Sequence, residues 1–152
     1  MQQWKSVDEI LDFAIGQEEE AAKFYTELSG RMDRPWMSKI FQDFAKEEMG
    51  HKKKLQDIKA GKLLLSAEKK VLDLKIGDYL VDVEPTSEHL DYQQALVIAM
   101  KKEKKAFKMY SDLADATDDA NIRAAFLSLA QEEAKHKLRF EIEYDDVIMS
   151  EN

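Results

Sequence analysis

Hydrophobic residues recur at alternating steps of three and four along four long segments of the chain, at about residues 6–30, 35–61, 87–116 and 120–147. This spacing keeps the apolar side chains on one face of an α-helix, because an α-helix completes a turn every 3.6 residues. Gly and Pro together account for only 5 + 2 of the 152 residues. The pattern therefore predicts an all-α protein.

The ends of these segments carry the residue types that start and stop helices. Ser6 and Glu9 form a capping box, in which side chains satisfy amide groups left open in the first turn. Pro35 suits the first turn of the second helix, where its missing amide is not needed. We expect Gly30 to close the first helix and Gly61 to close the second.

The connections differ in length, and this difference sets the topology. Short loops join the first helix to the second and the third to the fourth, whereas about residues 61–87 form a long crossover. Within it, residues 66–70 and 77–81 are expected to form short helical turns. The chain is thus predicted to be a single domain over 1–152, a ferritin-like antiparallel four-helix bundle made of two helical hairpins joined by a long crossover.

The two hairpins are copies of one pattern, at about residues 6–60 and 88–147, related by an offset of 85. A gapless match through a helix, a loop and a second helix indicates a pseudo-twofold arrangement. The matched pairs are Glu18 with Glu103, Ala21 with Ala106, Tyr25 with Tyr110, Phe41 with Phe126, Glu48 with Glu133 and His51 with His136.

Each apolar stripe has a glutamate near its middle, and the second and fourth stripes add a histidine three residues later on the same face. Burying an ionised carboxylate without compensation costs several kcal/mol, so four central glutamates need positive charge nearby. Two histidines cannot neutralise four carboxylates, and we expect about two divalent cations instead. The predicted metal ligands are Glu18, Glu48, His51, Glu103, Glu133 and His136. Glu143 interrupts the fourth stripe, so the helix phase is less well defined near its end.

Carboxylate and imidazole donors without thiolate suit iron, manganese or zinc. By the symmetry of the repeat, Glu18 and His51 would serve one ion and their equivalents the other, while Glu48 and Glu133 bridge both. The competing interpretation is a salt-bridged helical face whose register is shifted.

Tyr25 and Tyr110 lie two turns from Glu18 and Glu103 on the same stripes. Each hydroxyl could hydrogen-bond a ligand carboxylate and hold it in place, or each ring could simply fill the core.

Charge and composition narrow the classes of partner. The net charge of −8 disfavours nucleic acid. The longest apolar run, Ala95 to Met100, is too short to span a membrane, and the first residues lack an apolar signal core, so we expect a cytoplasmic protein. The chain has no cysteine, which excludes disulfides and thiolate metal sites within it.

These residues resemble the rubrerythrin branch of the ferritin-like superfamily over almost the whole chain. The resemblance rests on Glu18 and Tyr25, on Glu48-x-x-His51, and on their equivalents in the second half. It implies a non-haem di-iron site in a four-helix bundle, and a protein that reduces hydrogen peroxide or oxidises ferrous iron with dioxygen.

The chain departs from that family in two ways. It lacks the four cysteines of a rubredoxin-like domain, so electrons would come from Fe²⁺ itself or from an external donor protein. Ala106 stands one turn after Glu103, where some rubrerythrins offer a further glutamate for redox-dependent movement of iron.

The function expected is that of a di-iron, or di-metal, oxidoreductase acting on peroxide or dioxygen. The alternatives are a non-catalytic iron-binding or storage-type protein, and a scaffold that binds zinc or manganese only for stability. We also expect a homodimer, because Ile15, Phe24, Ile40 and Met100 are apolar beyond what the inward stripes need.

Overall fold

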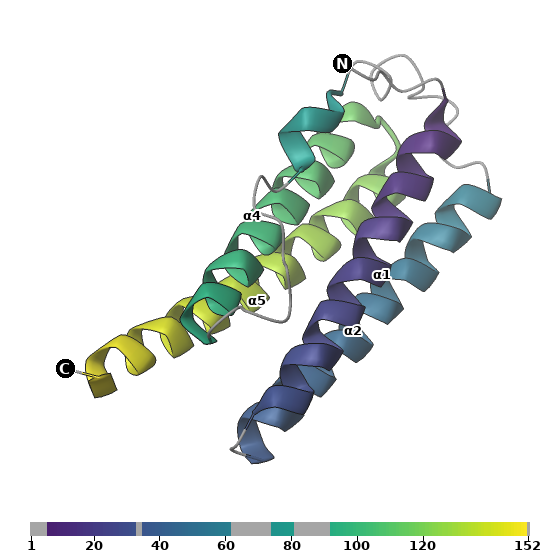
Figure 1. Cartoon of the computed structure of the whole chain (residues 1–152). Helices are drawn as coiled ribbons and strands as arrows, with labels where there is room; N and C mark the ends of the chain where they lie inside the picture. Colours follow the sequence, from purple (N-terminus) through teal and green to yellow (C-terminus); the bar gives the residue numbers. More distant parts are fainter. Residues whose placement is uncertain (1–5, 33–34, 62–73, 81–91, 152) are drawn as a thin grey trace. The chain divides into compact units, whose positions relative to one another are not determined.

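The computed structural model describes residues 6–32, 35–61, 74–80 and 92–151 (Figure 1). The chain divides into two compact units, one within residues 3–73 and one within residues 74–152. Each unit contains one pair of long helices, and the described residues contain no β-strand. Both predicted helical hairpins are therefore present.

The first hairpin consists of α1 (Val7–Arg31) and α2 (Pro35–Ala60), which pack against each other. Each helix turns one apolar stripe inward. Leu11 and Leu28 of α1 are buried, as are Phe41 and Leu55 of α2. Their burial removes apolar surface from water at about 25 cal/mol per Å², which stabilises the hairpin more than helix propensity does.

The start of α1 follows the sequence pattern, but its end differs by one residue. The backbone amide of Glu9 donates to the Ser6 hydroxyl over 3.1 Å, which confirms the predicted N-cap. Gly30 does not close the helix, because α1 continues to Arg31 and ends at Met32. Met32 takes an extended backbone (φ −81°, ψ 128°), so no residue with a left-handed backbone is needed there.

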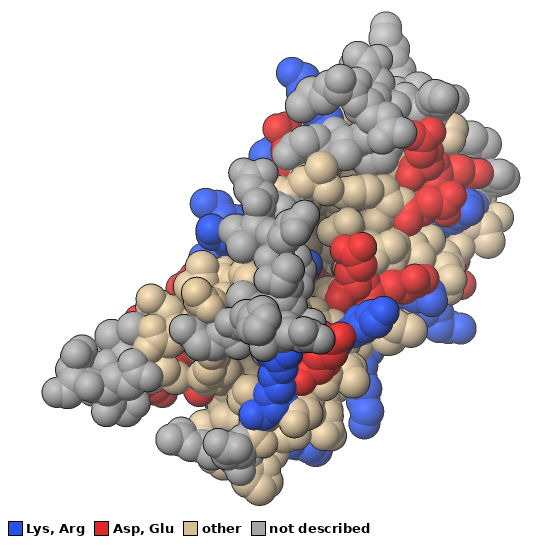
Figure 2. Space-filling model, in the orientation of Figure 1, with Lys and Arg blue, Asp and Glu red and all other residues tan. Residues whose placement is uncertain are grey.

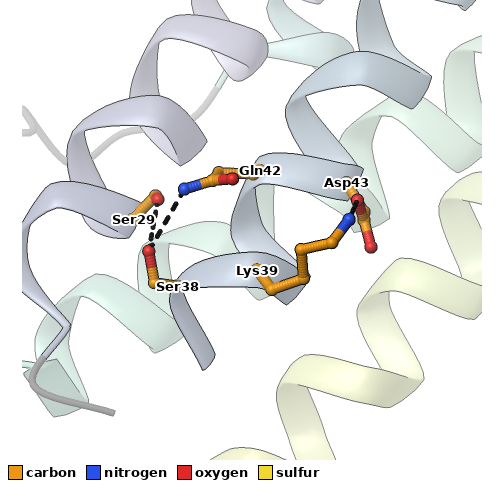
Figure 3. Close-up of polar contacts among 5 residues, drawn as sticks. All are labelled: Ser29, Ser38, Lys39, Gln42 and Asp43. Atoms are coloured by element: carbon orange, nitrogen blue, oxygen red, sulfur yellow. Dashed lines mark hydrogen bonds and ion pairs between the residues drawn. The ribbon is translucent and has the colours of Figure 1, made fainter. Parts of the chain in front are cut away.

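Hydroxyl groups tie the end of α1 to the beginning of α2 (Figure 3). The Ser29 and Ser38 hydroxyl oxygens lie 2.9 Å apart, and the Gln42 amide donates to Ser38 over 3.3 Å. Nearby, Lys39 pairs with Asp43 one turn along α2. The Ser29–Ser38 contact holds the end of α1 beside the start of α2.

The second hairpin consists of α4 (Tyr92–Ala116) and α5 (Ala120–Glu151). Asp119 caps α5 by accepting the Ile122 amide over 3.0 Å, and Arg123 donates to the Thr117 carbonyl over 2.7 Å. The loop is short, as predicted. The part of the third predicted helix at 87–91 lies outside the described residues, and α5 extends past 147 to Glu151.

One described piece of the crossover is the 3₁₀ helix η2 (Ile76–Tyr79), which packs on α4 and overlaps the predicted turn at 77–81. The Tyr79 hydroxyl donates to Asp112 over 2.8 Å, and the Lys108 ammonium donates to the same carboxylate over 2.9 Å. The Tyr79 bond holds η2 against α4, and the Lys108 ammonium also lies 5.6 Å from the centroid of the Tyr79 ring. The predicted turn at 66–70 lies outside the described residues.

Acidic and basic side chains are interspersed on the face of the molecule shown in Figure 2. Within the first hairpin, Lys59 of α2 pairs with Asp12 of α1. Exposed pairs of this kind contribute about 0–1 kcal/mol each. Within the described residues, every helix is either too short or too polar to cross a bilayer.

Candidate metal centre

The first hairpin brings together the three predicted ligands that it carries. Glu18 lies near the middle of α1, while Glu48 and His51 lie three residues apart on one face of α2. Oxygen and nitrogen atoms of these three side chains lie within 4.8 Å of one another. The His51 Nδ1 atom is 3.6 Å from Glu18 Oε2 and 3.9 Å from Glu48 Oε2.

The second hairpin repeats this arrangement. Glu103 of α4 meets Glu133 and His136 of α5, again with candidate ligand atoms within 4.8 Å of one another. The His136 Nδ1 atom is 3.6 Å from Glu103 Oε1, the same separation as in the first hairpin. Sequence repetition at an offset of 85 is thus matched by repetition of side-chain geometry. Each hairpin carries its own Glu-Glu-His set.

Both Glu-Glu-His sets are shielded from water. The six side chains belong to residues that are only 1–5% exposed. An ionised carboxylate in such surroundings costs several kcal/mol unless a positive charge is close. Each set holds two carboxylates and one imidazole, so the histidine alone cannot balance the charge.

The donor spacing fits a bound cation better than direct hydrogen bonds. The separations of 3.6 and 3.9 Å exceed the 2.7–3.2 Å of an N–H···O bond. Two donors that each lie about 2.1 Å from one ion are roughly 3 to 4 Å apart. Carboxylate oxygens and imidazole nitrogens, with no thiolate in the chain, suit iron, manganese or zinc. The residues present therefore fit such a metal.

The surroundings of the two sets differ in charge. Beside the first set, Lys52 pairs with Glu19 over 2.9 Å, and these residues adjoin His51 and Glu18. The equivalent positions in the second hairpin are Lys137 and Lys104, both basic. There Lys137 pairs with Glu141 on its own helix instead. The repeat therefore preserves the ligand types more strictly than their neighbours.

Tyr25 and Tyr110 are fully buried on the predicted stripes. The ring of Tyr25 packs edge-on against Phe44 with centroids 6.2 Å apart, and Tyr110 stacks on Phe126 at 6.4 Å. Both tyrosines thus contribute to the apolar core of their hairpins. A role of their hydroxyls towards the ligands stays a prediction.

Glu143, which interrupts the fourth apolar stripe, is a buried residue of the second hairpin. Glu143 is buried and accepts a hydrogen bond of 2.9 Å from the Tyr92 hydroxyl. At an offset of 85, the first hairpin has Ile58 and Val7 in these places. The spacing along α5 does indicate burial of Glu143, because this residue follows His136 by seven residues and so lies on the same face of the helix.

Comparison with known proteins agrees with this geometry. A model of the rubrerythrin family matches residues 9–144. Among solved structures, a protein from Thermotoga maritima described as ferritin-like and diiron-carboxylate superposes with a TM-score of 0.78 at 21% sequence identity, over 97% of this chain and 99% of that one. No curated protein matches the chain. The structural likeness confirms the predicted fold class, an all-α ferritin-like four-helix bundle.

Proposed function

The chain belongs to the rubrerythrin family, and on this premise we propose that its two Glu-Glu-His sets together bind two metal ions and act as a di-metal oxidoreductase centre. The observation that carries the proposal is the repeated burial of two carboxylates and one imidazole within 4.8 Å in each hairpin. Four carboxylates carry four negative charges, which two divalent ions balance. The proposal thus accounts for charges that would otherwise destabilise the core.

Each side chain has a distinct role in this proposal. Glu18 and His51 would bind one ion, with His51 using Nδ1, the nitrogen nearest the carboxylates. Glu103 and His136 would bind the other ion in the same way. Glu48 and Glu133 would each bridge the two ions. The hydroxyls of the buried tyrosines would orient the ligand carboxylates and so limit their freedom to swing away.

Iron is the metal we propose, and manganese and zinc are the alternatives. Family membership supports iron, as does a donor set without thiolate. Two bound ferrous ions would supply one electron each for the reduction of peroxide or dioxygen. The protein would position the ions and keep bulk water away through buried aromatic side chains such as Phe41 and Phe126. Since the chain has no cysteine, the electrons that restore the ferrous state would come from Fe²⁺ or from a separate donor protein.

A single-turnover experiment tests this function. Metal-free protein is loaded anaerobically with two equivalents of Fe²⁺ and mixed with either peroxide or dioxygen, while ferric absorbance is followed. We expect oxidation at least about tenfold faster than that of free Fe²⁺ with one of the two oxidants. The matched control is Glu47→Ala, an exposed neighbour of Glu48, which should keep the full rate.

The outcomes separate the candidate functions. Oxidation at the rate of free iron, with no iron bound, would overturn the proposal. Iron that is bound but not oxidised faster would instead favour the storage-type or structural alternative, and sedimentation would then show whether the chain builds a large hollow shell.

A further inference from the structure

Glycine interrupts both helices of the first hairpin beside the candidate ligands. Gly16 stands two residues before Glu18 in α1. In α2, Gly50 stands between Glu48 and His51. Glycine inside a helix is unfavourable relative to alanine, because it gives up the most backbone freedom when the helix forms. Two weak points of the helices therefore lie within two residues of the ligands of this hairpin.

Packing does not explain these two glycines. Gly50 is exposed and Gly16 is half-buried. Among the described residues, no atom beyond the chain neighbours and the local helix backbone lies within 4 Å of the place where a Cβ would stand at either position. Alanine would therefore fit at both positions and would strengthen both helices.

The second hairpin lacks these weak points. At the offset of 85, Lys101 and Lys135 take the places of Gly16 and Gly50, and lysine favours a helix. Neither α4 nor α5 contains a glycine at any position. The difference in propensity between glycine and a good helix former corresponds to about a fivefold change in the population of the locally unwound helix. The first hairpin should therefore unwind beside its ligands more often than the second.

Charge distinguishes the two Glu-Glu-His sets in a second, independent way. The residues within two positions of the first set include three glutamates and three lysines, which are Glu19, Glu20, Glu47, Lys46, Lys52 and Lys53. Around the second set, one glutamate stands against six lysines, which are Lys101, Lys102, Lys104, Lys105, Lys135 and Lys137. A cation that approaches the second set therefore meets a positive field, whereas the charges around the first set balance.

The ion pair that crosses the first hairpin holds its helices together only weakly. The Lys52 ammonium lies 2.9 Å from a Glu19 carboxylate oxygen, and these residues adjoin His51 and Glu18. The Glu19 side chain is 52% exposed, so water screens the pair. The pair therefore opens at little cost when either helix unwinds locally.

From these differences we propose that metal enters and leaves the protein through the first hairpin, where α1 and α2 unwind locally beside Gly16 and Gly50. The first set is then the exchangeable half of the centre, and the second set is the half that retains its ion. Coordination bonds form and break along this route, and no ion changes its oxidation state. Because the route serves the proposed di-metal centre, it rests on the proposed function.

Hydrogen exchange of the full-length, metal-free chain tests the local unwinding without any metal. We expect amide protection in residues 14–22 and 46–54 to be at least about fivefold lower than in the equivalent residues 99–107 and 131–139. Gly16→Ala combined with Gly50→Ala should remove most of that difference. Equal protection in the two hairpins of the unmodified chain would overturn the proposal.

Gly30→Ala is the matched control for the exchange experiment. It makes the same change in the last turn of α1, where a Cβ would likewise have no described atom within 4 Å. It should leave the difference in protection between the ligand segments unchanged. If Gly30→Ala removes that difference as fully as the double variant does, glycine beside the ligands is not its cause and the proposal is wrong.

Metal release gives the second readout. The chain is loaded anaerobically with two equivalents of Fe²⁺ and mixed with an excess of a chelating dye. We expect two phases of equal amplitude whose rates differ by at least about fivefold, and Gly16→Ala with Gly50→Ala should slow only the faster phase. Lys101→Gly with Lys135→Gly should speed up the slower phase more than Lys101→Ala with Lys135→Ala, which removes the same charges but keeps good helix formers. A single phase, or equal effects of these two pairs, would overturn the proposal.

The two experiments separate the route from the proposed function. Unequal protection in a chain that binds no iron would overturn the di-metal function and the route together. Two bound ions that are released in a single phase would overturn the route alone.

Discussion

Glu48 illustrates at the scale of a single residue how a proposed metal ligand can favour function at the expense of stability. Its side chain is buried beside Glu18 and His51. Without a cation, two carboxylates at this distance repel each other in surroundings of low polarity. A bound cation would attract both carboxylates, and their burial would then be favourable. Removing the charge of Glu48 should therefore stabilise the metal-free protein and destabilise the metal-bound protein.

We predict that Glu48→Gln stabilises the metal-free protein by about 1–3 kcal/mol while it weakens metal binding. The measurement is urea unfolding with and without excess metal. In the unmodified protein, metal should raise the free energy of unfolding, whereas in the variant this gain should largely disappear. Glu47→Gln, one residue away and exposed, should change neither value. A loss of stability in metal-free Glu48→Gln would contradict this account of the carboxylate.

Replacing the buried tyrosines by phenylalanine tests whether their hydroxyls hold the ligand carboxylates or their rings only fill the core. Tyr25→Phe and Tyr110→Phe keep the ring contacts with Phe44 and Phe126 and remove only the hydroxyl. If the hydroxyl holds a ligand carboxylate, metal affinity should fall by about 10–100-fold. Competition titration with a chelating dye measures this affinity. Unchanged affinity in both variants would leave the tyrosines as core residues only.

The positions of the six candidate ligands could be predicted from sequence, because helical periodicity and the offset of 85 fix which residues share a face. Glu143 could not be predicted as a buried, bonded residue in the same way. The repeat places Ile58 at its equivalent position, and the donor, Tyr92, lies 51 residues away at the start of another helix. Contacts of this kind depend on how two helices pack, which periodicity does not specify.

At the scale of elements, the bond between Tyr92 and Glu143 joins the first turn of α4 to the later part of α5. We predict that Tyr92→Phe destabilises the protein by about 1–3 kcal/mol, since a buried carboxylate loses its donor. Adding Glu143→Ile, the residue type at the equivalent place in the first hairpin, should recover part of that loss. Chemical denaturation of the two single variants and the double variant gives the coupling. If the changes in the free energy of unfolding of the two single variants add up to that of the double variant, the two side chains act independently.

The attachment of η2 to α4 should depend on pH through the protonation of the Tyr79 hydroxyl. Burial, and then the hydrogen bond to Asp112, raise the pKa of Tyr79 well above its ordinary value near 10. The folded state therefore holds this proton when the unfolded state has lost it. The stabilisation is complete below about pH 10 and falls as pH rises further.

Unfolding free energies at pH 8.5 and pH 11 test this dependence. The unmodified protein should lose more stability between the two values than Tyr79→Phe does. An equal loss in both proteins would mean that Tyr79 does not couple to pH.

Helix existence and approximate bounds could be predicted from sequence, since capping residues such as Ser6 and Asp119 act locally. The end of α1 could not be placed at one residue, because Met32 ends the helix with an extended backbone that many residue types adopt. The position of η2 against α4 depends on the contacts of Tyr79 with Asp112 and Lys108, which are distant in sequence from the crossover.

For the whole molecule, duplication of one hairpin explains both the fold class and the two sets of candidate ligands. Each copy provides half of the proposed centre, so neither hairpin alone would hold two ions. The exposure of Leu138 and Ile142 could not be predicted from sequence, because they occur among core positions of α5 and only burial distinguishes them. The electron donor and a cytoplasmic location stay predictions.

Metal titration of the metal-free chain tests the central claim most directly. Calorimetry with Fe²⁺ under anaerobic conditions should give two ions bound per chain, and replacing Glu48 and Glu133 together by Ala should abolish binding of both. Fewer than two ions per chain, or two ions that persist in that double variant, would contradict the assignment of a di-metal centre.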